Sequence, residues 1–138
     1  MGLNVGIYGG SGYAGVELVR LLWGHPEVGG LRVASRGYAG MGISSVYPEL
    51  AVEGSYVAPE EIDASGLDVA FVAYGHRESA EAVSALIEAG VRLVVDLSAD
   101  FRLGDAGLYG EWYGEHPAPG LLDEAHHELR AGQRPHAA

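Results

Sequence analysis

A cluster of glycines near the start of the chain has the residue types and spacing that most clearly indicate chemistry. Residues 10–15 read GSGYAG and satisfy the pattern G-x-G-x-x-G, and Gly9 lengthens the flexible stretch. Glycine adopts positive φ readily and lets backbone N–H groups come close to a ligand. At the start of a helix, such N–H groups and the helix dipole favour an anion such as a pyrophosphate. Set between a strand and a helix, the pattern predicts a dinucleotide site formed by Gly9, Gly10, Ser11, Gly12, Tyr13, Ala14 and Gly15.

The end of the next predicted strand indicates which dinucleotide binds. In sites for NAD, an Asp or Glu about 20 residues beyond the glycines binds the ribose 2′-hydroxyl, whereas the 2′-phosphate of NADP requires a cation. Ser35 and Arg36 stand at this distance from Gly15, without a carboxylate beside them. A hydroxyl and a guanidinium hold a phosphate by charge-assisted hydrogen bonds, so we predict NADP. The alternative is that Arg36 is a solvated residue at a strand end.

Two further stretches carry polar side chains near predicted strand ends. His76 is a candidate proton donor or cofactor contact, because an imidazole titrates near neutrality. It is equally compatible with an ordinary histidine of a surface loop. Residues 96–102 read DLSADFR, with two carboxylates, a hydroxyl and a guanidinium around one aromatic ring. A turn closed by an ion pair between Asp100 and Arg102 is the simpler explanation of that stretch.

Alternating strands and helices are expected to position these stretches. Strand patterns cover residues 3–7, 31–36, 67–74 and 92–96, and helix patterns cover residues 16–23 and 78–89. Between them, residues 37–66 predict a loop, one short helix and a short edge strand near Tyr56 and Val57. This order predicts an α/β fold, a Rossmann-like, doubly wound and mostly parallel sheet in a single domain. Ligands bind beyond the carboxyl ends of such strands, so all the candidate stretches should line one crevice.

The helix patterns also predict which side chains face the sheet. In the first helix these are Val16, Leu18, Val19, Leu21, Leu22 and Trp23, and in the second they are Ala80, Val83, Leu86 and Ile87. Residues 124–138 have little apolar periodicity, and an irregular tail is expected there. We therefore divide the chain into a cofactor domain, residues 1–122, and a tail, residues 123–138.

Composition narrows the possible functions. The chain has 138 residues, 48% of them hydrophobic, and a formal charge of -11, which disfavours nucleic acid and anionic membranes as partners. No leader-like segment precedes the first strand, so the cytoplasm is the expected location. The absence of cysteine excludes thiolate metal sites and a thiol nucleophile within this chain. The six histidines are scattered, and no metal site is predicted.

Three stretches together resemble one enzyme family. GGSGYAGVELVRLLWGHPEV at 9–28, ASRGYAG at 34–40 and VVDLSADFRLGDAGLYGEWYGEHP at 94–117 closely resemble the amino-terminal part of N-acetyl-gamma-glutamyl-phosphate reductases. They also resemble the family's relative in lysine biosynthesis, which reduces a carrier-linked aminoadipyl phosphate. The likeness covers about residues 3–122, and its DLSADFR stretch is far more specific than the glycine pattern.

The resemblance implies a role for each candidate residue. Gly9 to Gly15 would hold the NADP pyrophosphate, and Ser35 and Arg36 would hold the 2′-phosphate. His76 and Ser98 would border the nicotinamide, with Asp100 and Arg102 on the substrate side. It also implies NADPH-dependent reduction of an acyl phosphate in arginine biosynthesis, and a homo-oligomeric full-length protein.

The chain departs from the family at two places. Residues 74–77 read YGHR where the family usually has Leu-Pro-His-Gly, so only the histidine carries over. The likeness ends before the family's catalytic cysteine and substrate domain, so no catalytic residue is expected here and the chain alone should be catalytically incomplete. The alternatives are the lysine-pathway reductase, a non-catalytic NADP(H)-binding module, and a related enzyme such as aspartate-semialdehyde dehydrogenase, which the DLSADFR and WYG stretches disfavour.

Overall fold

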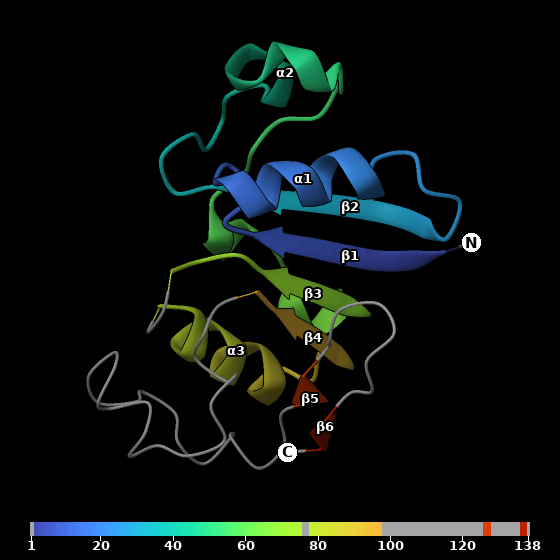
Figure 1. The fold of residues 1–138 in the computed structure, drawn as a ribbon, viewed down its shortest axis with the longest axis vertical. Coiled ribbons are helices and arrows are strands. Elements are labelled where there is room, and N and C mark those ends of the chain that lie inside the picture. Colours follow the sequence, from blue (N-terminus) through green and yellow to red (C-terminus); the bar gives the residue numbers. More distant parts are fainter. Residues whose placement is uncertain (1, 76–77, 98–125, 128–135, 138) are drawn as a thin grey trace.

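Four parallel strands form the central sheet of the molecule (Figure 1). The computed structural model describes residues 2–75, 78–97, 126–127 and 136–137. The strands are β1 (Leu3–Tyr8), β2 (Val28–Ala34), β3 (Val69–Val72) and β4 (Leu93–Asp96), in the order β2-β1-β3-β4. Every neighbouring pair is parallel. The chain therefore starts at the middle of the sheet and builds outward in both directions, as a doubly wound fold does.

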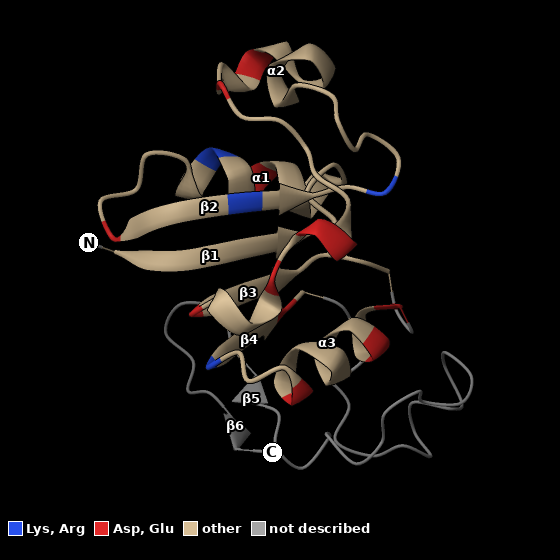
Figure 2. Ribbon diagram, turned by 180° about the vertical axis from the view of Figure 1, so that it is seen from behind, with Lys and Arg blue, Asp and Glu red and all other residues tan. Residues whose placement is uncertain are grey.

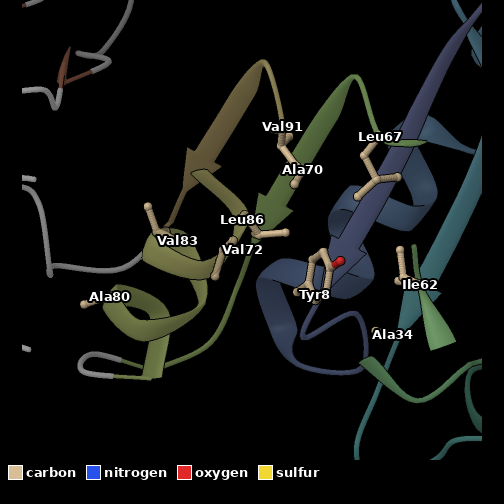
Figure 3. Packing of buried hydrophobic residues seen from close by; sticks show 10 residues of the cluster. All are labelled: Tyr8, Ala34, Ile62, Leu67, Ala70, Val72, Ala80, Val83, Leu86 and Val91. Atoms are coloured by element: carbon tan, nitrogen blue, oxygen red, sulfur yellow. The ribbon is translucent and has the colours of Figure 1, made fainter. Parts of the chain in front are cut away.

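The two main helices cover opposite faces of this sheet. On one face, Ile7 and Val33 pack in a cluster with Val19 of α1 (Tyr13–Leu22). On the other face, the next residues along these strands, Tyr8 and Ala34, belong to a second cluster with α3 (Glu78–Glu88). Figure 3 shows ten residues of that second cluster, which join α3 to β1 and β3. Side chains that alternate between two covered faces confirm the predicted α/β, Rossmann-like fold.

The connection from β2 to β3 is folded against both clusters. It contains α2 (Ile43–Val46) and three short 3-10 helices, η1 (Pro48–Leu50), η2 (Pro59–Glu61) and η3 (Ala64–Gly66). Ile43 and Tyr56 are buried with the α1 cluster, whereas Ile62 belongs to the α3 cluster. Val57 makes an isolated parallel bridge with Ala34, next to β2. The expected short helix is thus present as α2, whereas the short edge strand expected near Tyr56 and Val57 is reduced to this isolated bridge.

Several details of the elements differ from the sequence prediction; the strand predicted over 67–74, for example, covers only Val69–Val72. The strand predicted over 31–36 begins at Val28 and ends at Ala34, because pairing with β1 starts before the glycines at 29 and 30. The apolar faces of the helices are also narrower than predicted. Leu21 is 59% exposed and Ile87 is 41% exposed. Leu21 turns away from the sheet because it lies two residues from the buried Val19 on a helix with 3.6 residues per turn, whereas Ile87 is exposed in the last turn of α3.

The described residues beyond β4 form a small antiparallel pair, β5 (His126–His127) with β6 (His136–Ala137). These four residues lie in the tail predicted to be irregular, whose other residues lie outside the described part. Within the described residues, no helix is long and apolar enough to cross a membrane.

Candidate dinucleotide site

The carboxyl ends of the four strands lie in one row. Tyr8 pairs with Ala34 on one side and with Val72 on the other, and Val72 pairs with Asp96. The segments that follow these residues leave the sheet at one edge, which we call the carboxyl edge. The structure thus brings together the glycine loop (9–15), Ser35 with Arg36, and Tyr74. His76, Ser98, Asp100 and Arg102 follow β3 and β4 but lie outside the described residues.

The glycine loop turns sharply and packs tightly against itself. Gly9 has a φ of 82°, in the left-handed region that glycine tolerates. The Gly10 N–H then donates to the Ala34 carbonyl at 2.9 Å, which ties the loop to the end of β2. A Cβ on Gly15 would stand 2.1 Å from the Gly9 carbonyl oxygen. The first turn of α1 can therefore approach the loop this closely only with glycine at position 15.

The start of α1 points its free backbone donors at the carboxyl edge. The first hydrogen bond of the helix runs from the Val16 N–H to the Gly12 carbonyl at 2.8 Å. The N–H groups of residues 13–15 precede that bond and have no acceptor within the helix. The first turn carries no acidic side chain, and Tyr13 is 98% exposed. Such a helix start suits an anion.

Ser35 lies inside the protein, only 2% exposed. Its hydroxyl is 2.8 Å from the hydroxyl of Ser11 and accepts a hydrogen bond from the Tyr38 N–H at 3.2 Å. Ser35 therefore links the glycine loop to the segment after β2, and its hydroxyl faces the loop rather than solvent.

Arg36, by contrast, presents its charge at the surface. Its guanidinium carbon lies 4.9 Å from the ring centroid of Tyr74, in a cation–π contact. Its Nη1 is 3.9 Å from Oε2 of Glu78, and both side chains are about 60% exposed. Of the other described arginines, Arg20 lies in the last turn of α1, Arg32 within β2 and Arg92 just before β4. Figure 2 shows acidic residues spread widely over the described chain. Within the described part, Arg36 supplies the arginine charge at the carboxyl edge.

A cavity of about 220 Å³ opens beside Arg36, on the face of the sheet that α3 covers. The rings of Tyr8 and Tyr74 line it, together with apolar side chains from the η2–η3 segment and α3: Pro59, Ile62, Ala64, Ala82, Ala85 and Leu86. Burial raises the pKa of the Tyr74 hydroxyl, and Arg36 partly opposes that rise. Among the described residues this buried hydroxyl has no hydrogen-bond partner. A flat aromatic group with one polar edge would suit these walls.

Two tyrosines from the connection between β2 and β3 donate hydrogen bonds to the backbone of the glycine loop. The Tyr47 hydroxyl donates to the Ser11 carbonyl, and the Tyr56 hydroxyl donates to the Gly10 carbonyl at 3.4 Å. Burial, with smaller effects from Tyr47 and Tyr38, raises the pKa of Tyr56 to about 12. The sequence analysis missed both contacts, as well as Glu78 beside Arg36. No motif marks these residues, and only the fold brings them to the carboxyl edge.

Within the part of the chain that the structure describes, no three or more His, Asp or Glu side chains gather as metal ligands would.

A parallel sheet wound in both directions from a glycine loop is typical of dinucleotide-binding domains, and a cation after the second strand is found where they accommodate a 2′-phosphate. Residues 4–129 match the family model described as the semialdehyde dehydrogenase NAD-binding domain. The chain belongs to this family.

Curated relatives place the chain more closely within that family. It is 74% identical, over 129 residues, to the N-acetyl-gamma-glutamyl-phosphate reductase of Rubrobacter xylanophilus. It is 48% identical, over 123 residues, to the enzyme of that name from Dehalococcoides mccartyi. These matches cover 94% and 88% of the chain but only 38% and 35% of the relatives. The chain therefore spans little more than a third of the length of the proteins that it resembles.

Solved structures agree on the fold. Aspartate semialdehyde dehydrogenase II from Vibrio cholerae superposes with a TM-score of 0.60 at 26% identity, over 74% of this chain and 30% of that one. Aspartate semialdehyde dehydrogenase with NADP from Candida albicans gives a TM-score of 0.59 at 23% identity, over 74% and 31% of the two chains. At this identity the second likeness shows the fold alone.

Proposed function

We propose that this chain is the NADP-binding part of an N-acetyl-gamma-glutamyl-phosphate reductase, an oxidoreductase of arginine biosynthesis. The family match and the 74% identical relative support the reductase assignment. The observation that carries the choice of cofactor is the position of Arg36, after β2 and against Tyr74. Residues 1–122 would form the cofactor domain, with the substrate domain beginning in the tail, residues 123–138. The lysine-pathway reductase and a non-catalytic module remain the alternatives.

In this proposal the chain binds and orients the cofactor. The N–H groups at the start of α1 hold the pyrophosphate, because they are free of intrahelical acceptors and carry the positive end of the helix dipole. Arg36 holds the 2′-phosphate by charge-assisted hydrogen bonds. The cavity beside Tyr8 and Tyr74 receives the adenine, whose flat ring suits its apolar walls.

One sequence assignment changes in this proposal, and the others are kept. We give Ser35 a supporting role, because its buried hydroxyl is bonded to Ser11 and to the Tyr38 N–H. His76, Ser98, Asp100 and Arg102 keep the roles that the family resemblance implies, toward the nicotinamide and the substrate. A homo-oligomeric full-length protein is proposed on the same ground.

The reaction itself requires a group that this chain does not contain. In the proposed chemistry a cysteine thiolate displaces phosphate from the acyl phosphate, which leaves a thioester. A hydride supplied by bound NADPH would reduce the thioester to the aldehyde, with cleavage of its C–S bond and release of the cysteine thiolate and NADP⁺. The chain has no cysteine, and a serine hydroxyl is a weak nucleophile without an activating base.

NADPH absorbance in the presence of N-acetylglutamyl phosphate tests this function. The chain alone should bind NADPH without consuming it, and consumption should begin when a cysteine-bearing remainder of the longer protein is supplied. Turnover by the cysteine-free chain, abolished by Ser98→Ala or His76→Ala, would show that these residues perform the chemistry and would overturn the proposal.

A further inference from the structure

Two side chains from the far side of β1 contact the guanidinium of Arg36. Tyr74 follows β3 and Glu78 begins α3, whereas Arg36 follows β2. Glu78 Oε2 lies 3.9 Å from Arg36 Nη1, and the two side chains are 60% and 62% exposed. An ion pair this open to water is weak and is easily exchanged for another anion.

The two partners of Arg36 differ in charge. Tyr74 contacts the guanidinium through its ring face, and its phenol is neutral at neutral pH, because burial raises a pKa that is ordinarily already near 10. Tyr74 can therefore hold Arg36 in place while a phosphate binds. Glu78 is an anion at the same guanidinium, so a phosphate and the Glu78 carboxylate cannot both be accommodated there without repulsion.

A carboxylate at this point also resembles the acidic residue of NAD sites. There, an Asp or Glu at the end of the second strand accepts a hydrogen bond from the ribose 2′-hydroxyl. In this chain the second strand is followed by Ser35 and Arg36, and the carboxylate arrives instead from the start of α3. The contact with Arg36 places the Glu78 carboxylate at the guanidinium that would meet position 2′ of the ribose.

We propose that Glu78 is a specificity-determining residue, which competes with the 2′-phosphate for Arg36 and offers an acceptor to a 2′-hydroxyl. The inference rests on the proposed dinucleotide site. The chain then discriminates less sharply between NADP and NAD than Arg36 alone would allow. One exposed carboxylate on α3 causes this loss of discrimination.

Calorimetric titration of the full 138-residue chain with NADP and with NAD tests the proposal. Glu78→Gln should raise the affinity for NADP about two- to five-fold, the size expected for an exposed ion pair, without raising the affinity for NAD. Glu81→Gln is the matched control, because Glu81 also lies in the first turn of α3 and its replacement removes the same charge. It should leave the ratio of the two affinities unchanged.

The double variant separates competition for Arg36 from general repulsion. In an Arg36→Ala background, the gain for NADP from Glu78→Gln should be smaller, because the competition for the guanidinium is gone and only the direct repulsion between the carboxylate and the phosphate remains. An equal gain from Glu78→Gln and Glu81→Gln, or a gain that is undiminished without Arg36, would overturn the inference while leaving the cofactor assignment intact. An NADP/NAD ratio that Arg36→Ala does not lower, or no NADP binding by the unmodified chain, would overturn the assignment and the inference together.

Discussion

Arg36 and Ser35 are neighbours in sequence, yet they have opposite environments. The guanidinium of Arg36 reaches the surface beside Tyr74 and Glu78, whereas the hydroxyl of Ser35 is buried against Ser11. A cation that water reaches can exchange one anion for another, whereas a buried hydroxyl with fixed partners positions the loops around it. In the proposed site, the choice of cofactor would therefore depend on Arg36, and the shape of the site would depend on Ser35.

Replacing Arg36 with Asp should reverse the cofactor preference. The substitution puts a carboxylate where a 2′-phosphate would bind and gives a 2′-hydroxyl an acceptor, so NAD should then bind more tightly than NADP. The affinity for NADP should fall at least about ten-fold, as expected for loss of a charge-assisted hydrogen bond. Arg20→Asp is the control, because it makes the same change of charge on α1. Equal effects of the two substitutions on the NADP/NAD ratio would contradict the role of Arg36.

The buried hydroxyl of Tyr56 should make stability depend on alkaline pH. Burial raises the pKa of Tyr56 from 10.0 to about 12, so between these values the unfolded chain loses a proton that the folded chain retains. The contribution of Tyr56 is complete below pH 10 and is lost as the pH rises toward 12.

Urea unfolding over this pH range measures the effect. The free energy of unfolding should fall less steeply with pH in Tyr56→Phe than in the unmodified chain. Tyr13→Phe, at a position that is 98% exposed, should keep the original slope. If the free energy of unfolding fell equally steeply with pH in the unmodified chain and in Tyr56→Phe, the Tyr56 hydroxyl would not have the raised pKa that its burial implies.

The strand, glycine loop and helix at the start of the chain form a tightly fitted unit. Gly9 takes the left-handed turn, and Gly15 lets α1 begin against the Gly9 carbonyl. Below them, Tyr47 and Tyr56 donate hydrogen bonds to the backbone of the loop. The position of the loop thus depends on the connection between β2 and β3 as well as on its own glycines.

Gly15→Ala should destabilise this unit and weaken dinucleotide binding together. An added Cβ meets backbone atoms at 2.1 Å and 2.6 Å, so the helix must shift, at a cost of about 1–3 kcal/mol in the free energy of unfolding. Gly66→Ala is the control, since no atom lies within 4 Å of a Cβ there. Chemical denaturation and NADP titration of both variants provide the measurement. If Gly15→Ala were as stable as Gly66→Ala and bound NADP as tightly, the close approach of α1 to the Gly9 carbonyl would not be required.

The sequence predicted those parts of the fold that short stretches determine. Alternating apolar residues, the glycine pattern and the position of Arg36 relative to Gly15 are all readable along the chain, and the structure confirms the strands and helices that they indicate. Tyr47 and Tyr56, by contrast, lie in a connection of weak periodicity. Their hydrogen bonds to the glycine loop span sequence separations of 36 and 46 positions. The strand β2 includes glycines that disfavour a strand, and its pairing with β1 overrides that preference. Such contacts follow from tertiary packing, which local patterns do not contain.

The whole chain combines a strongly negative net charge with a proposed site for an anionic ligand. Its formal charge is -11, so long-range electrostatics oppose a dinucleotide with several phosphates. Binding must then come from local groups at the carboxyl edge, namely the start of α1 and Arg36. If Arg36 holds the added phosphate of NADP as proposed, local attraction should outweigh the general repulsion for the 2′-phosphate as well.

The most direct test of this account is titration of the unmodified chain with NADP and NAD at the same ionic strength. We expect NADP to bind about ten-fold more tightly, a difference of about 1.4 kcal/mol, and the difference to shrink as salt is added. Equal affinities, or tighter binding of NAD, would contradict the claim that Arg36 makes this domain select NADP.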